Sequence, residues 1–231
     1  MKRAAYACFL LLGFSLSAVS ASYFPNEYFP LARGNTWTYR GLTKWTLPSG
    51  EVESAILTLK MEVLDTWQSG QIFAALIKGF PSEYAWYEPG QERTFHLIIR
   101  TENKHFYLFH DEQAETIFRE IRETPDQRAY LAKLFSPESL FLIAPLTDGK
   151  IYGNDGKIRQ DQRYCWRVKK DPKRNSQAFI LRMDTLPDRT EISFVPGLGI
   201  YSYIYIHSGT VAETRLYLID IERPNATQSR P

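Results

Sequence analysis

Cysteine is nearly absent from this sequence, which limits the kind of protein it can be. The chain has two cysteines, Cys8 and Cys165. Cys8 lies in an N-terminal segment that we expect to be removed, so one thiol remains and no internal disulfide can form. Secreted eukaryotic domains usually carry disulfides, so a bacterial envelope is the better match. We expect Cys165 to be an inert packing residue within a strand.

Long apolar runs are also absent beyond the N-terminus. Residues 1–21 have the order of a signal peptide: Lys2 and Arg3, an apolar stretch, then Val19 and Ala21 at the positions that a signal peptidase accepts. The apolar stretch is shorter than the roughly 20 residues of a spanning helix, although an uncleaved anchor is the alternative. We expect export to the bacterial periplasm or the extracellular space, and no transmembrane segment after cleavage.

An excess of either charge is missing as well. The chain has 28 Lys and Arg and 26 Asp and Glu. Two of the basic residues, Lys2 and Arg3, lie in the leader, which leaves 26 residues of each sign. Nucleic-acid binding usually needs a basic excess that releases phosphate counterions. We therefore expect no nucleic acid among the partners.

Catalytic and metal-binding motifs are absent too. The four histidines, at 96, 105, 110 and 207, have none of the spacings of zinc sites. There is no Gly-x-Ser-x-Gly elbow and no Ser-x-x-Lys motif. We expect surface or interface positions for the histidines, no metal site, no cofactor and no catalytic residue identifiable by motif.

Alternation of apolar and polar residues is abundant, and it predicts a mainly β protein. Trp37, Tyr39 and Trp45 share one face of a predicted strand, and Thr38 and Arg40 lie on the other. One-faced strands of this kind are typical of antiparallel sheets. Similar alternation predicts strands at 36–47, 54–65, 93–100, 163–169, 178–184, 191–195, 200–207 and 210–223. Turn residues separate them, among them a hairpin signal at Asn154-Asp155-Gly156.

The period becomes helical between residues 112 and 135. Ala114, Ile117, Phe118 and Ile121 recur at helical spacing, and Asp126 is a suitable N-cap for a second helix. This insert either covers an open end of the sheet or is simply a helical crossover. We predict one β-rich domain over 22–224 and a flexible polar tail at 225–231.

Two segments resemble a group of uncharacterised bacterial exported proteins. The first, Tyr28-Phe29-Pro30-Leu31 followed by Gly34-Asn35, Trp37 and Tyr39, is similar to their "YFPL…GN-W-Y" opening. The second, Pro196-Gly197-Leu198-Gly199 before a strand, is similar to their C-terminal "PGxG" strand pair. The resemblance implies a curved antiparallel sheet or half-open β-barrel, similar to lipoprotein-carrier and lipocalin-like folds. It implies no chemistry, and this leader lacks the lipid-attachment cysteine of many such proteins.

Aromatic side chains are the candidates for ligand contact, because they combine a large apolar area with a polar tip. Tyr201, Tyr203 and Tyr205 alternate along one predicted strand, and the alternative is that the aromatics form core and cross-strand pairs. The candidate ligand-binding residues are Trp37, Tyr39, Trp45, Trp86, Tyr201, Tyr203 and Tyr205.

Three functions follow from these patterns. The first is a non-enzymatic binding protein whose barrel takes an apolar or amphipathic small molecule. The second is an envelope interaction or scaffold protein with a protein partner. The third is a hydrolase with a dispersed site, which requires a pocket with a His–carboxylate pair and perturbed pKa values.

Overall fold

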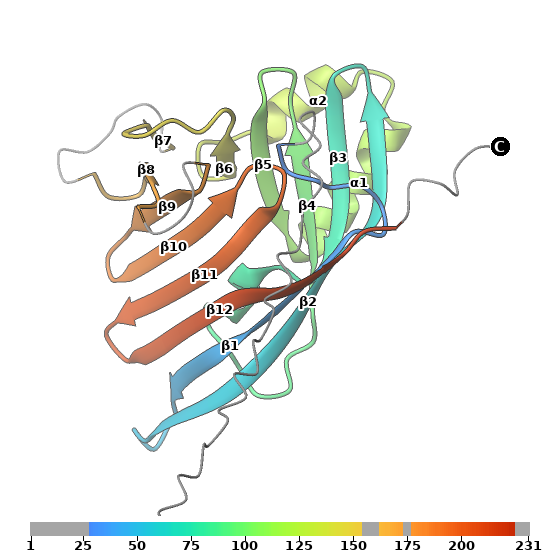
Figure 1. The fold of residues 1–231 in the computed structure, drawn as a ribbon. Helices are drawn as coiled ribbons and strands as arrows, with labels where there is room; N and C mark the ends of the chain where they lie inside the picture. Colours follow the sequence, from blue (N-terminus) through green and yellow to red (C-terminus); the bar gives the residue numbers. More distant parts are fainter. Residues whose placement is uncertain (1–27, 154–161, 173–176, 225–231) are drawn as a thin grey trace, which may run out of the picture.

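The computed structural model describes residues 28–153, 162–172 and 177–224. The predicted leader, the hairpin signal at 154–156 and the C-terminal tail lie outside these residues. Twelve antiparallel strands form one sheet in the order β6-β5-β4-β3-β2-β1-β12-β11-β10-β9-β8-β7. Figure 1 shows this sheet curving into an open barrel, which confirms the predicted fold class.

The strands confirm most of the predicted alternation. Their bounds are β1 Thr36–Thr46, β2 Val52–Ser69, β3 Ile72–Lys78, β4 Phe95–Arg100, β5 His105–His110, β6 Leu140–Ile143, β7 Ile151–Tyr152, β8 Trp166–Lys170, β9 Phe179–Asp184, β10 Asp188–Val195, β11 Gly199–Ser208 and β12 Val211–Glu222. Cys165 is an exception, because it lies in a turn before β8 and not within the strand. It is buried there, and its Sγ donates to the carbonyl of Gln162.

The first and last strands meet in the middle of the sheet. β1 pairs with β12 from Thr36 opposite Glu222 to Trp45 opposite Ala212. At Gly41 the two backbones come so close that a Cβ atom would lie 1.7 Å from the carbonyl oxygen of Arg215. Only glycine permits this approach, so Gly41 is needed for the pairing.

The two edges of the sheet are consecutive strands, β6 and β7. No ladder joins them in the described part of the chain. Side chains bridge the gap instead: the Tyr152 hydroxyl donates to the carbonyl of Phe141 at 3.1 Å, and the Phe141 ring meets Trp166 edge-on. We call this opening between β6 and β7–β8 the seam.

The helical insert joins β5 to β6, as a helical crossover would. It contains α1 (Asp111–Glu123) and α2 (Gln127–Leu134), and Asp126 caps α2 by accepting the Ala129 N–H. The buried face of α1, which includes Ile117 and Ile121, packs on the outer face of β3–β5 (Figure 1). The helices therefore do not close an end of the barrel.

Among the described residues, large side chains fill the barrel interior around Trp37 and Tyr39. Trp37 and Tyr39 are fully buried, and each donates a hydrogen bond to a backbone carbonyl, that of Leu198 or Ile200. Phe29 packs edge-on against Trp37 and Phe194. Cavities are therefore found toward the margins of this core.

Replacing Gly41 with alanine should strongly destabilise the fold, because the added methyl would overlap the backbone of Arg215. We expect the free energy of unfolding in urea to fall by about 3 kcal/mol or more. Gly70→Ala is the control, because Gly70 has a positive φ but open space around it, and it should cost about 1 kcal/mol. Equal losses of unfolding free energy in the two variants would show that β1 and β12 can move apart at Gly41 to accept the methyl group.

Candidate functional site

The site begins with a short turn that folds into the barrel after β3. Gly79 adopts a φ of +79°, and the 3-10 helix η1 (Pro81–Tyr84) follows. Proline at the first position and glutamate at the third suit a helix start, and Glu83 Oε1 accepts the Phe80 N–H at 2.9 Å. This capping contact holds the Glu83 side chain inside the protein, where it is 3% exposed.

Two histidines from adjacent strands lie beside Glu83. His96 on β4 and His110 on β5 are direct cross-strand neighbours, with ring centroids 4.9 Å apart. His96 is buried, with the Phe80 ring stacked on it, and its Nδ1 lies 3.3 Å from Glu83 Oε1. Glu83 and His96 therefore form a buried His–carboxylate pair.

Three buried polar atoms of this cluster have no hydrogen-bond partner among the described residues. They are Ser82 Oγ, Glu83 Oε2 and His96 Nδ1; the 3.3 Å contact of His96 lacks hydrogen-bond geometry. Leaving a buried polar group unsatisfied costs about 1–3 kcal/mol. Three such atoms in one place indicate a site that a ligand or water completes.

Burial keeps both members of the pair uncharged over much of the pH range. Desolvation raises the pKa of Glu83 to about 7, against the smaller opposing effects of hydrogen bonds from the Phe80 N–H and from the backbone and side chain of Thr94, and of the charge of Arg93. Desolvation, followed by the nearby His110, lowers the pKa of His96 to about 3. Below neutral pH the site therefore holds a carboxylic acid next to a neutral imidazole.

A cavity of about 170 Å³ opens at the seam in front of this cluster. Ser82 and His110 line it directly, and Glu83 and His96 lie behind them. Thr190 and Tyr203 add hydroxyl groups from β10 and β11, and the segment before β6 adds the hydroxyl of Ser139 and the carboxyl group of Glu138. The apolar side chains that line it are Phe80, Leu108, Leu140, Phe141, Trp166, Met183 and Ile192.

The predicted aromatic residues are distributed over several places. Trp37 and Tyr39 lie in the filled core, and Trp45 packs edge-on against Tyr87. Tyr203 lines the seam cavity. Tyr201 lies at a bulge in β11: Ser193 pairs with Ser202 and the next residue, Phe194, pairs with Ile200, so Tyr201 has no partner in the β10 ladder. The alternation of inward and outward side chains is therefore interrupted at Tyr201. A role for these aromatics in ligand contact remains a prediction.

Trp86 and Tyr205 meet at a second His–carboxylate pair. Trp86 is 54% exposed and packs against Tyr205 and His207. Asp188 Oδ1 accepts from the Tyr205 hydroxyl at 2.8 Å and contacts His207 Nδ1 at 2.7 Å. Every polar group in this contact has a partner, in contrast to the cluster at the seam.

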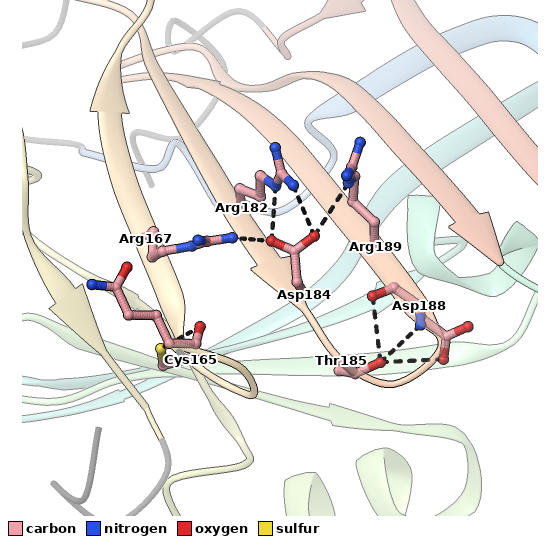
Figure 2. A network of polar contacts seen from close by, with 8 residues as sticks. Cys165, Arg167, Arg182, Asp184, Thr185, Asp188 and Arg189 are labelled. Atoms are coloured by element: carbon pink, nitrogen blue, oxygen red, sulfur yellow. Dashed lines mark hydrogen bonds and ion pairs between the residues drawn. The ribbon is translucent and has the colours of Figure 1, made fainter. Parts of the chain in front are cut away.

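A third polar cluster lies on the outer face of β8–β10 (Figure 2). Arg167, Arg182 and Arg189 converge on the carboxylate of Asp184. Cross-strand neighbours on one face place them there: Arg167 pairs with Arg182, and Asp184 with Arg189. The carboxylate lies where the guanidinium groups meet, so each of the three arginines already has an ionic partner.

The expected surface or interface position of the histidines is wrong for His96. Its strand alternates as predicted, but α1 covers the face of Leu97 and Ile99 from outside, so the face of His96 points into the barrel. Sequence reasoning also missed Ser82 and Glu83. The available signal was Phe80-Pro81-Ser82-Glu83, a capping sequence directly after a strand.

The described residues contain neither a group of metal ligands nor a helix that could span a membrane. None of their His, Cys, Asp and Glu side chains form a group of three that could hold a metal ion. Within the described ranges, no helix is long and apolar enough to cross a membrane.

Comparison with known proteins gave only distant similarities. No family model and no curated protein matches the chain. A "putative lipoprotein" of Parabacteroides distasonis has a TM-score of 0.34 at 10% identity over 85% of this chain and 98% of its own. A "putative exported protein with YmcC-like fold" of Bacteroides fragilis has a TM-score of 0.36 at 8% identity over 85% and 99%. Similarity at this level carries no information about ligand or location.

The buried Glu83 should make the free energy of unfolding depend on pH, and replacing this residue should reveal its contribution. Between pH 4.5 and 7 the folded state keeps a proton that unfolded Glu83 releases, so this group lowers stability as pH rises. His96 acts in the opposite direction between about pH 3 and 6.5, because only the unfolded state takes up its proton as pH falls. Wild-type stability should therefore change little where the two ranges overlap.

The stability of Glu83→Gln relative to wild type should therefore increase from pH 4.5 to 7 by roughly 3 kcal/mol, since one pKa unit corresponds to about 1.4 kcal/mol. Urea unfolding at several pH values measures the difference, with the exposed Glu53→Gln as control. Parallel curves for Glu83→Gln and wild type would contradict a buried, neutral Glu83.

Proposed function

We propose that this protein is an exported bacterial binding protein that takes a small amphipathic ligand at the seam. The observation that carries the proposal is the convergence of Ser82 Oγ, Glu83 Oε2 and His96 Nδ1, all buried and unpartnered, beside an otherwise largely apolar cavity. A ligand with an apolar body and a polar head would supply the hydrogen bond that Ser82 Oγ lacks, since Ser82 lines the cavity whereas Glu83 and His96 lie outside its lining. Export to the periplasm or extracellular space rests on the leader pattern of residues 1–21.

The cavity volume limits the ligand to about one ring or a short chain. A cavity of roughly 150 Å³ is enough for benzene, and this one measures about 170 Å³. Phe141, Trp166 and Met183 supply walls for an apolar body. A larger molecule would require β6 to move away from β8, which side-chain contacts and not a ladder hold together.

The chemistry of the cluster favours an uncharged polar head, such as a hydroxyl. Ser82 can donate or accept, and the neutral His96 imidazole presents a nitrogen that lacks a partner. A carboxylate head would place a charge in a cavity whose described lining has no Lys or Arg and includes the carboxyl group of Glu138. An uncharged hydroxyl, directly or through one water, avoids placing a charge there.

Phenol, toluene and benzoate form a matched set of probes for this proposal. Phenol should bind most tightly in NMR titrations at pH 6, with shifts in Ser82, His110 and Tyr203. Ser82→Ala should weaken phenol about fivefold, because one hydrogen bond contributes about 1 kcal/mol. Ser49→Ala, in an exposed turn, is the control. Equal affinity for phenol and toluene, or no effect of Ser82→Ala, would overturn the proposal.

Hydrolysis is the second candidate function, because Glu83 and His96 supply the His–carboxylate pair with shifted pKa values that it requires. Turnover of p-nitrophenyl butyrate that is lost in both Ser82→Ala and His96→Gln would establish it. Phenol binding without any turnover above background would leave binding as the function.

A further inference from the structure

A second cavity lies at the opposite end of the same inner strands. Arg100 on β4 follows His96 by four residues and so faces the same side of the sheet. The two residues are separated by about 13 Å along the strand. Ile98 and its cross-strand partner Leu108 lie between the two positions. The cavity next to Arg100 measures about 430 Å³, within the usual size range of ligand pockets.

Arg100 is a cation without a countercharge in the described part of the chain. Its guanidinium carbon lies 5.3 Å from the centre of the Phe73 ring, and no carboxylate among the described residues is within ion-pair distance. The cation–π contact holds the side chain over the ring and leaves its N–H donors available. A half-buried guanidinium that faces a cavity is a ready partner for a carboxylate or phosphate.

The surrounding charges do not neutralise Arg100. Glu102 also lines the cavity, but Arg128 Nη2 contacts its carboxylate at 3.3 Å. Lys104 adds a second positive charge from an exposed position on the same wall. The described lining therefore carries a net positive charge once the Glu102–Arg128 pair is counted.

The remaining walls combine apolar surface with amide groups. Phe106, Ala144 and Pro145 form the apolar part, and Gln68 and Gln71 contribute amides from the β2–β3 turn. A free inorganic anion would contact the positively charged side chains but not the apolar wall. A molecule with an anionic head and a short hydrocarbon body would contact both.

We infer that this cavity is a second ligand site, in which Arg100 binds the carboxylate of a small amphipathic acid. The acid's hydrocarbon part lies against Phe106, Ala144 and Pro145. The site is independent of the seam, because different residues line the two cavities. The two sites also differ in chemistry: the seam has a buried neutral acid, whereas this cavity has an unneutralised cation.

Isothermal titration with octanoate, octanol and inorganic phosphate tests this inference. Octanoate should bind at least ten times more tightly than octanol or phosphate, and its affinity should fall with added salt because a charge pair is involved. Arg100→Gln should weaken octanoate at least tenfold, and Arg100→Lys should weaken it less. Octanol should be unaffected by either change.

Arg40→Gln is the matched control, because Arg40 is an exposed arginine on the outer face of β1. This variant should leave octanoate binding unchanged. Ser82→Ala at the seam should also leave it unchanged, so that loss of binding at the Arg100 cavity can be distinguished from loss of binding at the seam. Equal binding of octanol and octanoate, or unaltered octanoate affinity in a folded Arg100→Gln variant, would overturn the inference. Phosphate binding as tight as octanoate would also overturn it, in favour of a site for free anions.

Discussion

The pairing of β1 with β12 is the constraint on which the rest of the structure depends. It joins the first and last strands in the middle of the sheet through a long antiparallel ladder, with Gly41 at its closest approach. The two halves of the chain then extend outward on either side of this pair. The edges of the sheet must therefore be the strands at mid-chain, β6 and β7, so the barrel is incomplete there.

The candidate site follows from that incomplete closure. An unclosed edge lacks ladder hydrogen bonds, and here Tyr152, Phe141 and Trp166 replace them with side-chain contacts. Trp37, Tyr39 and their neighbours fill the core among the described residues. Of the buried side-chain atoms without a hydrogen-bond partner among the described residues, Ser82 Oγ, Glu83 Oε2 and His96 Nδ1 lie together at this cluster, whereas Trp45 Nε1 lies apart from them on β1.

The alternation of apolar and polar residues predicted most strands well, because these strands bury one face and expose the other to solvent. It placed Trp37 and Tyr39 on one face of β1, and the capping pattern placed Asp126 at the start of α2. The alternation failed to place His96, because α1 covers the outer face of β4 and so both faces of that strand are buried. Tyr201 escaped the pattern because a bulge in the β10–β11 pairing interrupts it.

The site itself could not be predicted from spacing. Its residues come from η1, β4, β5, β10 and β11, and they meet only because the sheet curves and η1 folds inward at Gly79. Phe80-Pro81-Ser82-Glu83 predicts a capped turn, but nothing local indicates that this turn is buried against two histidines. Dispersed sites of this kind depend on the position of the sheet edges, which the β1–β12 pairing determines.

A crystal structure of the protein grown with phenol would test the central claim most directly. A phenol molecule should occupy the seam cavity, with its ring against Phe141 and Trp166 and its hydroxyl bonded to Ser82 Oγ, directly or through one water. Phenol absent from the seam, with Ser82, Glu83 and His96 instead hydrogen-bonded to one another, would contradict it.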